Sequence, residues 1–359
     1  MNQNIDELDG HFDFVKYLGE FDKKGEFGKI KENDTVDPKD RLVYFNRKPK
    51  LENQSEGQTN ICQSSSVQKN YKNTEMVLSD SIYQPRTKNK NKNVFFTESG
   101  IYVPTIDKNT MINAETITVN EMGPNQSQLF ENGGRSICLM AIKAIGGPRR
   151  LRPDNHNTPP VIVLLVGNNK AGIYGLCAGR HLASRGCEVI CLLVGNQDSE
   201  FNKDLLEQYK YTQYSGVKMI NSIQKLPNPL KQPIDLIIDG LLGYEYSINS
   251  ISLQFEQQLI NELISWVNNS QTPALSIDLP AGLLLEKGSI VTSNNNSILP
   301  KWTIALGAPQ KMVQYRHLIG ELFLGDIGIP NKVWERVGIS SWQPPFGATY
   351  LIRLDFIEE

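Results

Sequence analysis

The sequence VIVLLV at Val161–Val166, followed by GNNKAG at Gly167–Gly172, decides the fold. An unbroken aliphatic run is typical of a strand that is buried on both faces of a parallel sheet. The glycine-containing turn leads into a helix that we expect from about 173 to 184. A buried strand, a turn and a helix in this order predict a βαβ unit with a right-handed crossover.

The alternation of strands and helices continues on both sides of this unit. Upstream, an extended segment at 101–104 precedes helices over 113–145, with Pro124 as the boundary between them. Downstream, we predict helices at 203–211 and 252–268, and strands at 188–194, 235–239, 274–278, 302–306, 321–324 and 349–354. The sequence therefore predicts an α/β fold, a Rossmann-like three-layer sandwich over 101–359.

The first hundred residues have a different composition, rich in Asn, Gln, Ser, Lys and Asp. Segments with so few apolar residues rarely fold alone. We expect residues 1–11 to be disordered, 12–31 to form a binding motif, and 32–100 to be a disordered linker. The alternating basic residues between Arg86 and Lys92 fit either a solvated linker or a weak phosphate contact.

Several classes of protein are disfavoured by the sequence. The formal net charge of −2 provides no global attraction to nucleic acid. Met1–Gly10 is acidic and polar, unlike a signal peptide, and no apolar run could cross a bilayer. The odd number of cysteines, five, without a C-x-x-C pair predicts reduced thiols in the cytoplasm, and the four scattered histidines predict no metal site.

An aromatic–acidic repeat stands out in the N-terminal region because its surroundings are polar. Large aromatic residues normally enter a core, and this segment has too little apolar material to build one. Exposed aromatic residues in a solvated segment are typical of a peptide that folds onto a partner. The residues that we expect to contact such a partner are Phe12, Asp13, Phe14, Phe21, Asp22, Phe27 and Ile30.

A second group of candidate residues follows the predicted strands. Asn169, Asp239 and Asp278 lie at strand ends, where open α/β sheets place their ligands. Placement alone supports two interpretations equally, a shared ligand crevice or side chains that only cap the loops. The full set of residues that we assign to this pocket is Asn168, Asn169, Gly172, Asp239, Gly243 and Asp278.

Six blocks of sequence resemble the YjeF N-terminal domain family. They run in order over the region from about 104 to 355, and lie at 129–135, 167–182, 235–243, 276–282, 305–309 and 325–330. The family occurs as epimerases that repair hydrated NADH and NADPH, and in cytoplasmic scaffolds of mRNA decapping. The repeat of Phe12-Asp13-Phe14 and Phe21-Asp22-Lys23 resembles the FDF motif of the scaffolds, and the stretch 321–347, with Pro344–Gly347 near its end, also looks closer to them.

The resemblance to the scaffolds implies a set of partners and a place in the cell. The FDF motif would dock on the second RecA-like lobe of a DEAD-box decapping helicase, and the YjeF-like domain would form a homodimer. Such a protein would work in the cytoplasm, in P-bodies, and would contact mRNA. The candidate RNA-binding residues are Arg149, Arg150, Arg152, Lys170 and Arg180.

Departures from the epimerase pattern imply a protein without a catalytic residue or a cofactor. Lys170-Ala171 and Tyr174 replace part of the epimerase turn, where we expect their side chains to obstruct a dinucleotide, and Ala281 replaces a serine. Two alternatives stay open: an epimerase that uses Asp278 as acid and base, or a sensor that binds a nucleotide metabolite. Decapping scaffolds usually begin with an LSm domain, which is not visible before the motif here, so contact with the decapping enzyme is left open.

Overall fold

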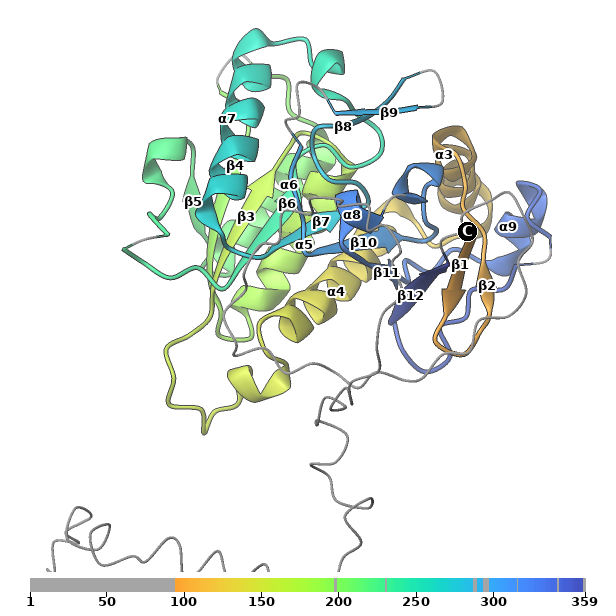
Figure 1. Cartoon of the computed structure of the whole chain (residues 1–359), viewed down its shortest axis with the longest axis horizontal. Coiled ribbons are helices and arrows are strands. Elements are labelled where there is room, and N and C mark those ends of the chain that lie inside the picture. Colours follow the sequence, from red (N-terminus) through yellow and green to blue (C-terminus); the bar gives the residue numbers. More distant parts are fainter. Residues whose placement is uncertain are drawn as a thin grey trace, which may run out of the picture. The chain divides into compact units, whose positions relative to one another are not determined.

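The structure, a computed structural model, describes residues 94–357 apart from 197–198, 230, 287–288, 293–296, 315 and 341. The binding motif expected at 12–31 and most of the expected linker lie outside the described residues. In the described part of the chain, one sheet has the strand order β2-β1-β12-β11-β10-β7-β6-β3-β4-β5 (Figure 1). Its strands are β1 (Val94–Thr97), β2 (Tyr102–Val103), β3 (Val161–Val166), β4 (Glu188–Leu193), β5 (Lys218–Ile220), β6 (Leu236–Gly240), β7 (Ala274–Ile277), β10 (Trp302–Leu306), β11 (Glu321–Gly325) and β12 (Leu351–Ile357).

The helices connect these strands, and a separate hairpin pairs β8 (Leu283–Glu286) with β9 (Ser289–Thr292). The α-helices are α3 (Lys108–Ile117), α4 (Gln126–Ala144), α5 (Lys170–Ala183), α6 (Lys203–Tyr214), α7 (Gln254–Ser270), α8 (Arg316–Ile319) and α9 (Asn331–Arg336). Short 3₁₀ segments are η3 (Pro148–Leu151), η4 (Ile223–Lys225), η5 (Ile248–Ser250) and η7 (Lys311–Gln314), and η2 (Thr118–Met122) is a π-helix.

The strand β3 is buried on both faces, as predicted. Its side chains alternate between two hydrophobic cores: Ile162, Leu164 and Val166 pack with residues of α4 and α5, whereas Val161, Val163 and Leu165 pack with residues of α7. The ladders from β5 to β11 are parallel, and β12, β1 and β2 add an antiparallel edge. The predicted α/β fold with helices on both faces of a buried sheet is confirmed.

The helices α4 and α5 pack closely because two glycines of α4 face α5. A Cβ atom on Gly133 would lie 2.4 Å from the ring of Tyr174, and one on Gly134 would lie 2.4 Å from the Cβ of Cys177. The two helix axes can therefore approach more closely than larger residues would allow. This contact fixes the position of α5, whose first turn borders the candidate pocket.

The predicted start of the folded domain is several residues too late. The expected linker reached residue 100, but β1 pairs antiparallel with both β12 and β2. The reason is the burial of Phe95, which has no exposed surface and packs 5.5 Å from the ring of Phe356. A strand of four residues after a long polar run is too short for a periodic signal, and the sequence analysis missed it.

We predict that Phe95→Ala destabilises the domain by about 3 to 5 kcal/mol, because it removes a fully buried ring from the core. The measurement is the free energy of unfolding from urea titration. Phe96→Ala is the matched control, because Phe96 lies one residue further along β1 and is only half-buried. An equal loss for both variants, or no loss for Phe95→Ala, would show that β1 is not part of the core.

Candidate functional site

The loops after β3 and β6 meet at the carboxyl edge of the sheet, where the strand order reverses. Asn169 caps α5, since its Oδ1 accepts a hydrogen bond from the backbone N–H of Gly172 at 3.0 Å. Its Nδ2 donates to the carbonyl of Leu241 in the β6 loop at 2.6 Å. The loops touch so closely that a Cβ atom on Gly167 would lie 1.8 Å from the same carbonyl oxygen. Asn169 therefore ties the two loops together.

The other expected pocket residues from this edge also join loops. Asn168 donates from Nδ2 to the carbonyl of Glu200 at 2.7 Å and accepts from the N–H of Asn202 at 2.9 Å. A Cβ atom on Gly172 would lie 2.1 Å from the Gly167 carbonyl oxygen. Gly243 has a positive φ of 62°, and its added Cβ would lie 2.8 Å from the Cβ of Ala171. Asn168 thus links two loops by hydrogen bonds, and the two glycines allow neighbouring backbone segments to pack closely.

Asp239, at the end of β6, uses both carboxylate oxygens inside the protein. Its Oδ1 accepts from the N–H of Leu241 at 3.1 Å. Its Oδ2 accepts from the hydroxyl of Ser276 at 2.8 Å and from the N–H of Ala281 at 3.0 Å. Burial raises the pKa of Asp239, and these three hydrogen bonds oppose the shift. Of the two interpretations of this residue, the geometry favours loop capping.

Asp278, after β7, has a different environment. The residue has a positive φ of 61°, and its Oδ1 accepts from the N–H of Leu306 at 2.9 Å. Burial raises its pKa to about 8, the Leu306 hydrogen bond opposes this, and the nearby charges of Glu115 and Glu245 raise it further. A buried carboxyl group that titrates near neutral pH is chemically able to exchange a proton.

Lys170 lies at the same edge and is held by two carboxylates. Its Nζ lies 2.5 Å from Oε2 of Glu115 and 2.9 Å from Oε1 of Glu245. The hydroxyl of Tyr244 donates to Oε1 of Glu115 at 3.2 Å. We call Glu115, Lys170, Tyr244 and Glu245 the Lys170 cluster. It places protein side chains at the edge of the sheet where a ligand of this fold would enter.

The charges of the Lys170 cluster do not favour an anion. Burial alone would lower the pKa of Lys170, but the charges and hydrogen bonds of Glu115 and Glu245 together raise it. Burial raises the pKa of Glu115, and the Lys170 charge opposes this. When all three groups are ionised, one positive charge faces two negative charges, so a diphosphate would be repelled at close range.

The ring of Tyr174 is buried rather than extended as expected, but its hydroxyl lies near the crevice, since burial and then the charges of Glu115 and Asp278 raise its pKa. Only 2% of its surface is exposed, and its ring packs edge-on against Phe130 with 5.3 Å between the centroids. The ring covers Gly133 of α4, so it belongs to the contact between α4 and α5. Lys170 does lie at the crevice, as expected, but in an ion-paired cluster rather than extended toward a ligand.

The sequence analysis missed Glu115, Tyr244 and Glu245. The position of Glu115 could have been noticed in the sequence. It lies one turn after Met111 and one residue after Ala114, on the buried face of α3. A carboxylate on an apolar helix face requires a buried partner. The sequence contains no comparable sign for Tyr244 and Glu245, which lie in the loop after β6.

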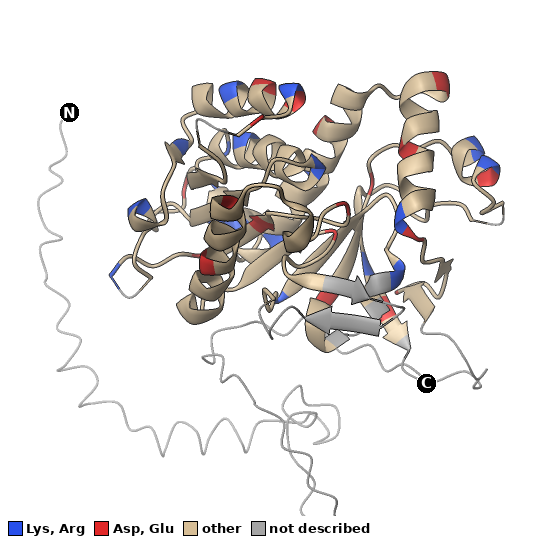
Figure 2. Ribbon diagram, turned by 90° about the horizontal axis from the view of Figure 1, so that it is seen from above, with Lys and Arg blue, Asp and Glu red and all other residues tan. Residues whose placement is uncertain are grey.

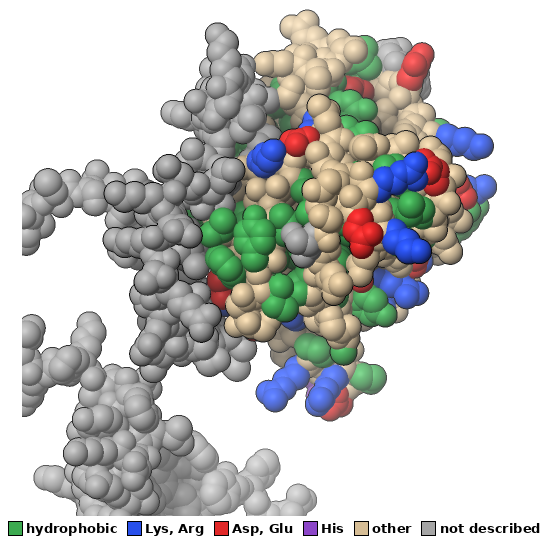
Figure 3. Space-filling view, turned by 90° about the vertical axis from the view of Figure 1, so that its right-hand side faces the viewer, with side chains coloured by type: hydrophobic (Ala, Val, Ile, Leu, Met, Phe, Trp, Pro, Cys, Tyr) green, Lys and Arg blue, Asp and Glu red, His purple; other side chains and the backbone are tan. Residues whose placement is uncertain are grey.

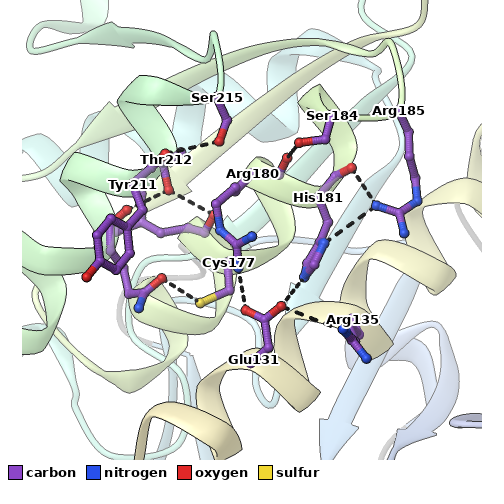
Figure 4. Close-up of polar contacts among 12 residues, drawn as sticks. Glu131, Arg135, Cys177, Arg180, His181, Ser184, Arg185, Tyr211, Thr212 and Ser215 are labelled. Carbon is purple, nitrogen blue, oxygen red and sulfur yellow. Dashed lines mark hydrogen bonds and ion pairs between the residues drawn. The ribbon is translucent and has the colours of Figure 1, made fainter.

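A second ion-paired group joins α4 to α5 on the outside of the sheet (Figure 4). Glu131 of α4 contacts the guanidinium of Arg180, lies 2.9 Å from Nε2 of His181, and lies 3.8 Å from Nε of Arg135. The neighbouring Cys177 is buried, which raises its thiol pKa to about 12, and its Sγ donates to Gln208. This group holds the two helices together, and its cysteine is not an activated nucleophile.

Three of the five candidate RNA-binding residues are engaged within the protein. Arg180 pairs with Glu131, Lys170 lies in its cluster, and Arg150 pairs with Asp235 at 2.9 Å. Arg149 and Arg152 are exposed at η3. Basic and acidic residues are interspersed over the described ribbon (Figure 2), and they lie next to one another on the face seen in Figure 3.

The described residues contain no group of three or more His, Cys, Asp or Glu side chains that could hold a metal ion. Over the same residues, no helix combines the length and the apolar character that crossing a membrane requires.

Comparison with known proteins identifies related chains. The profile described as YjeF-related protein N-terminus matches residues 126–312. Enhancer of mRNA-decapping protein 3 from Schizosaccharomyces pombe is 27% identical over 93% of this chain and 75% of its own length. The protein of that name from Gallus gallus is 30% identical over 98% of this chain, which spans 62% of that relative.

An enzyme and a solved structure also match. An NAD(P)H-hydrate epimerase from Dehalogenimonas lykanthroporepellens is 31% identical over 74% of this chain and 98% of its own length. The crystal structure of yeast ynu0 superposes with a TM-score of 0.56 at 18% identity, and covers 70% of this chain and all of that one. The solved structure supports the fold alone.

We predict that Asp278→Asn makes the domain less sensitive to pH. The carboxyl pKa is raised from 3.8 to about 8 in the folded protein, so the folded state keeps a proton that the unfolded state loses. Stability from this group is present below pH 4 and is lost as pH rises toward 8. The variant should match the unmodified chain near pH 4 and exceed it by a few kcal/mol at pH 8, since one pKa unit corresponds to about 1.4 kcal/mol.

The measurement is the free energy of unfolding at several pH values between 4 and 8.5. Asp154→Asn is the matched control, because Asp154 is exposed and should leave the whole curve unchanged. An Asp278→Asn curve parallel to that of the unmodified chain would contradict the raised pKa.

Proposed function

The chain belongs to the family of YjeF-related protein N-terminal domains, and from this premise we propose that it is a non-catalytic scaffold that promotes mRNA decapping. The observation that carries the proposal is the extent of the similarity. Decapping enhancers such as those from Schizosaccharomyces pombe and Gallus gallus match 93 and 98% of this chain, and two others match 72%, whereas the bacterial epimerase matches 74%. A match over 98% of the chain includes most of the region before β1. The epimerase matches over 98% of its own length but only 74% of this chain, so it has no counterpart of about a quarter of the chain.

The candidate site supports the same proposal. Asn169 and Asp239 use their polar atoms to hold loops together. The Lys170 cluster adds an excess of negative charge where a dinucleotide would bring its phosphates. A site that is occupied by its own ion pairs and repels phosphates suits a structural domain better than a dinucleotide enzyme.

The proposed partner of the N-terminal motif is a DEAD-box decapping helicase. Phe12 and Phe14 would fill apolar pockets on its second RecA-like lobe, with Phe21, Phe27 and Ile30 as a second anchor patch. Asp13 and Asp22 would face basic residues of the helicase, which sets the register more than the affinity. Folding of the segment upon binding would account for its lack of a core of its own.

A homodimer of the YjeF-like domain would carry two such motifs. Two tethered peptides can bridge two helicases and gain avidity without a new contact. Such bridging would concentrate the chain with mRNA in cytoplasmic P-bodies. Of the five candidate RNA contacts, Arg149 and Arg152 keep exposed side chains, so RNA binding by the domain would start at η3. Direct contact with the decapping enzyme is not part of the proposal.

Two observations favour a second function, epimerisation of hydrated NADH or NADPH. The bacterial epimerase is 31% identical over nearly its whole length. Asp278 is buried with a pKa of about 8, which suits an acid and base. The third alternative, a sensor of a nucleotide metabolite, would use the same carboxyl group for binding without turnover.

We predict that residues 1–40 capture the cytoplasmic decapping helicase, and that the double variant Phe12→Ala/Phe14→Ala does not. The reason is that two buried aromatic anchors each contribute about 2 kcal/mol or more, so their joint loss should lower the affinity at least a hundredfold. The measurement is a pulldown with purified helicase, followed by titration of the full chain.

The matched control is Tyr44→Ala/Phe45→Ala in the full chain, which removes two aromatic residues outside the motif and beyond residue 40. It should leave helicase capture unchanged. Capture that survives the Phe12/Phe14 double variant would refute the anchor assignment. No capture by the unmodified peptide would contradict the helicase proposal and favour a function of the pocket.

A further inference from the structure

Two exposed arginines lie together where the end of α5 packs on α4, at the opposite end of α5 from the crevice. In Figure 4, Arg135 of α4 and Arg185, which follows α5, lie on the same side of His181. The side chain of Arg185 reaches α4, since burial raises the pKa of Cys138 to about 11 and the charge of Arg185 opposes the shift. Cys138 comes three residues after Arg135 on α4, so the two arginines border the same stretch of the boundary between the helices.

The positive charges at this boundary outnumber the negative ones. Arg180 and Arg135 both pair with the carboxylate of Glu131. Burial lowers the pKa of His181, Glu131 opposes the shift, and the charges of Arg180 and Arg185 lower it further. The imidazole is therefore uncharged at neutral pH and adds no positive charge. Three guanidinium groups share one carboxylate, which leaves two positive charges in excess.

The excess charge lies on Arg135 and Arg185. Nε of Arg135 is 3.8 Å from Oε1 of Glu131, and the side chain is 65% exposed, so this contact leaves most of the guanidinium in solvent. Nη1 of Arg185 donates to the carbonyl of His181 at 2.9 Å, and within the described part of the chain no carboxylate contacts this guanidinium. Each arginine has five N–H donors and keeps several of them free. Two such groups side by side are suited to bind the oxygens of a phosphate.

The neighbouring residues favour a phosphorylated peptide over a nucleic acid. Leu139, one turn after Arg135, is exposed and offers an apolar contact to a peptide side chain. The helices α4 and α5, which are described without gaps, have Phe130 and Tyr174 as their only Phe, Tyr or Trp residues, and both are buried. A nucleic-acid base therefore finds no ring of this kind on which to stack. The carboxylate of Glu131 would also repel the next phosphate of a polyanion.

We propose that Arg135 and Arg185 form a binding site for a phosphoserine or phosphothreonine side chain of a partner polypeptide. Both guanidinium groups would donate to the phosphate, whose charge of about −1.5 to −2 matches the two positive charges in excess. An apolar residue next to the phosphorylated one would pack on Leu139. The site would let the chain bind a partner after a kinase has modified it, and it depends neither on the N-terminal motif nor on the proposed scaffold function.

The test uses the full chain and a fluorescein-labelled peptide of sequence GGLSGG with a phosphorylated serine, titrated by fluorescence polarisation at low salt. We expect saturable binding. Arg135→Gln and Arg185→Gln should each weaken it at least about fivefold, because each removes charge-assisted hydrogen bonds to the phosphate. Both side chains are exposed, so neither variant should change the free energy of unfolding by more than about 0.5 kcal/mol. Arg135→Lys keeps the charge without the planar fork and should retain part of the affinity.

Three controls make the outcome specific. Arg336→Gln removes the same charge from an exposed position on α9 and should leave the affinity unchanged within a factor of about two, since a distant exposed charge is screened. The peptide without the phosphate should bind at least about tenfold more weakly, since both arginines lose their partner. Single-stranded hexauridylate should bind more weakly than the phosphopeptide, because it has no base-stacking surface here.

Three results would overturn the proposal. They are absence of saturable binding, equal binding of the peptide without the phosphate, and binding that Arg135→Gln and Arg185→Gln leave unchanged. Tighter binding of hexauridylate that both variants weaken would also overturn it, and would assign the two arginines to RNA.

Discussion

The contact between the loops that follow β3 and β6 sets the arrangement of the whole carboxyl edge. The strand order reverses between these neighbours, and such a reversal normally opens a crevice for a ligand. Here the side chain of Asn169 bridges it, and the backbone N–H of Gly167 donates to the carbonyl of Gly240 at 3.0 Å. Any residue with a Cβ at position 167 would force the loops apart. With the loops joined, the first turn of α5 brings Lys170 to Glu115 and Glu245.

The Lys170 cluster gives a physical reason why the crevice of this domain can have a structural role in place of a catalytic one. A buried ion pair costs desolvation and contributes little net stability, but loss of one partner leaves an unpaired buried charge. The cluster therefore keeps α3, the start of α5 and the β6 loop together with an excess of negative charge. Asp278, at the same edge, keeps a carboxyl group suited to proton transfer, and Glu115 and Glu245 would repel a phosphate there when both are ionised.

The sequence predicted the centre of the fold better than its edges, for physical reasons. The strand β3 was predicted with its correct bounds because six aliphatic residues leave no other placement. The strands β1 and β5, near the two ends of the sheet, have four and three residues, too few for a period to show. The burial of the Tyr174 ring was missed because of the helix start. A start at 173 leaves Tyr174 at the turn, but α5 begins three residues earlier, at Lys170, and the ring packs against Phe130 of α4.

The central claim is that the YjeF-like domain of this chain is a scaffold whose crevice does not turn over a dinucleotide. The most direct test is the rate of epimerisation of hydrated NADH, with the purified full chain beside the Dehalogenimonas epimerase. The account predicts a rate equal to the spontaneous rate for this chain and rapid conversion by the bacterial enzyme. An acceleration by this chain that Asp278→Asn abolishes would contradict the account and establish an enzyme.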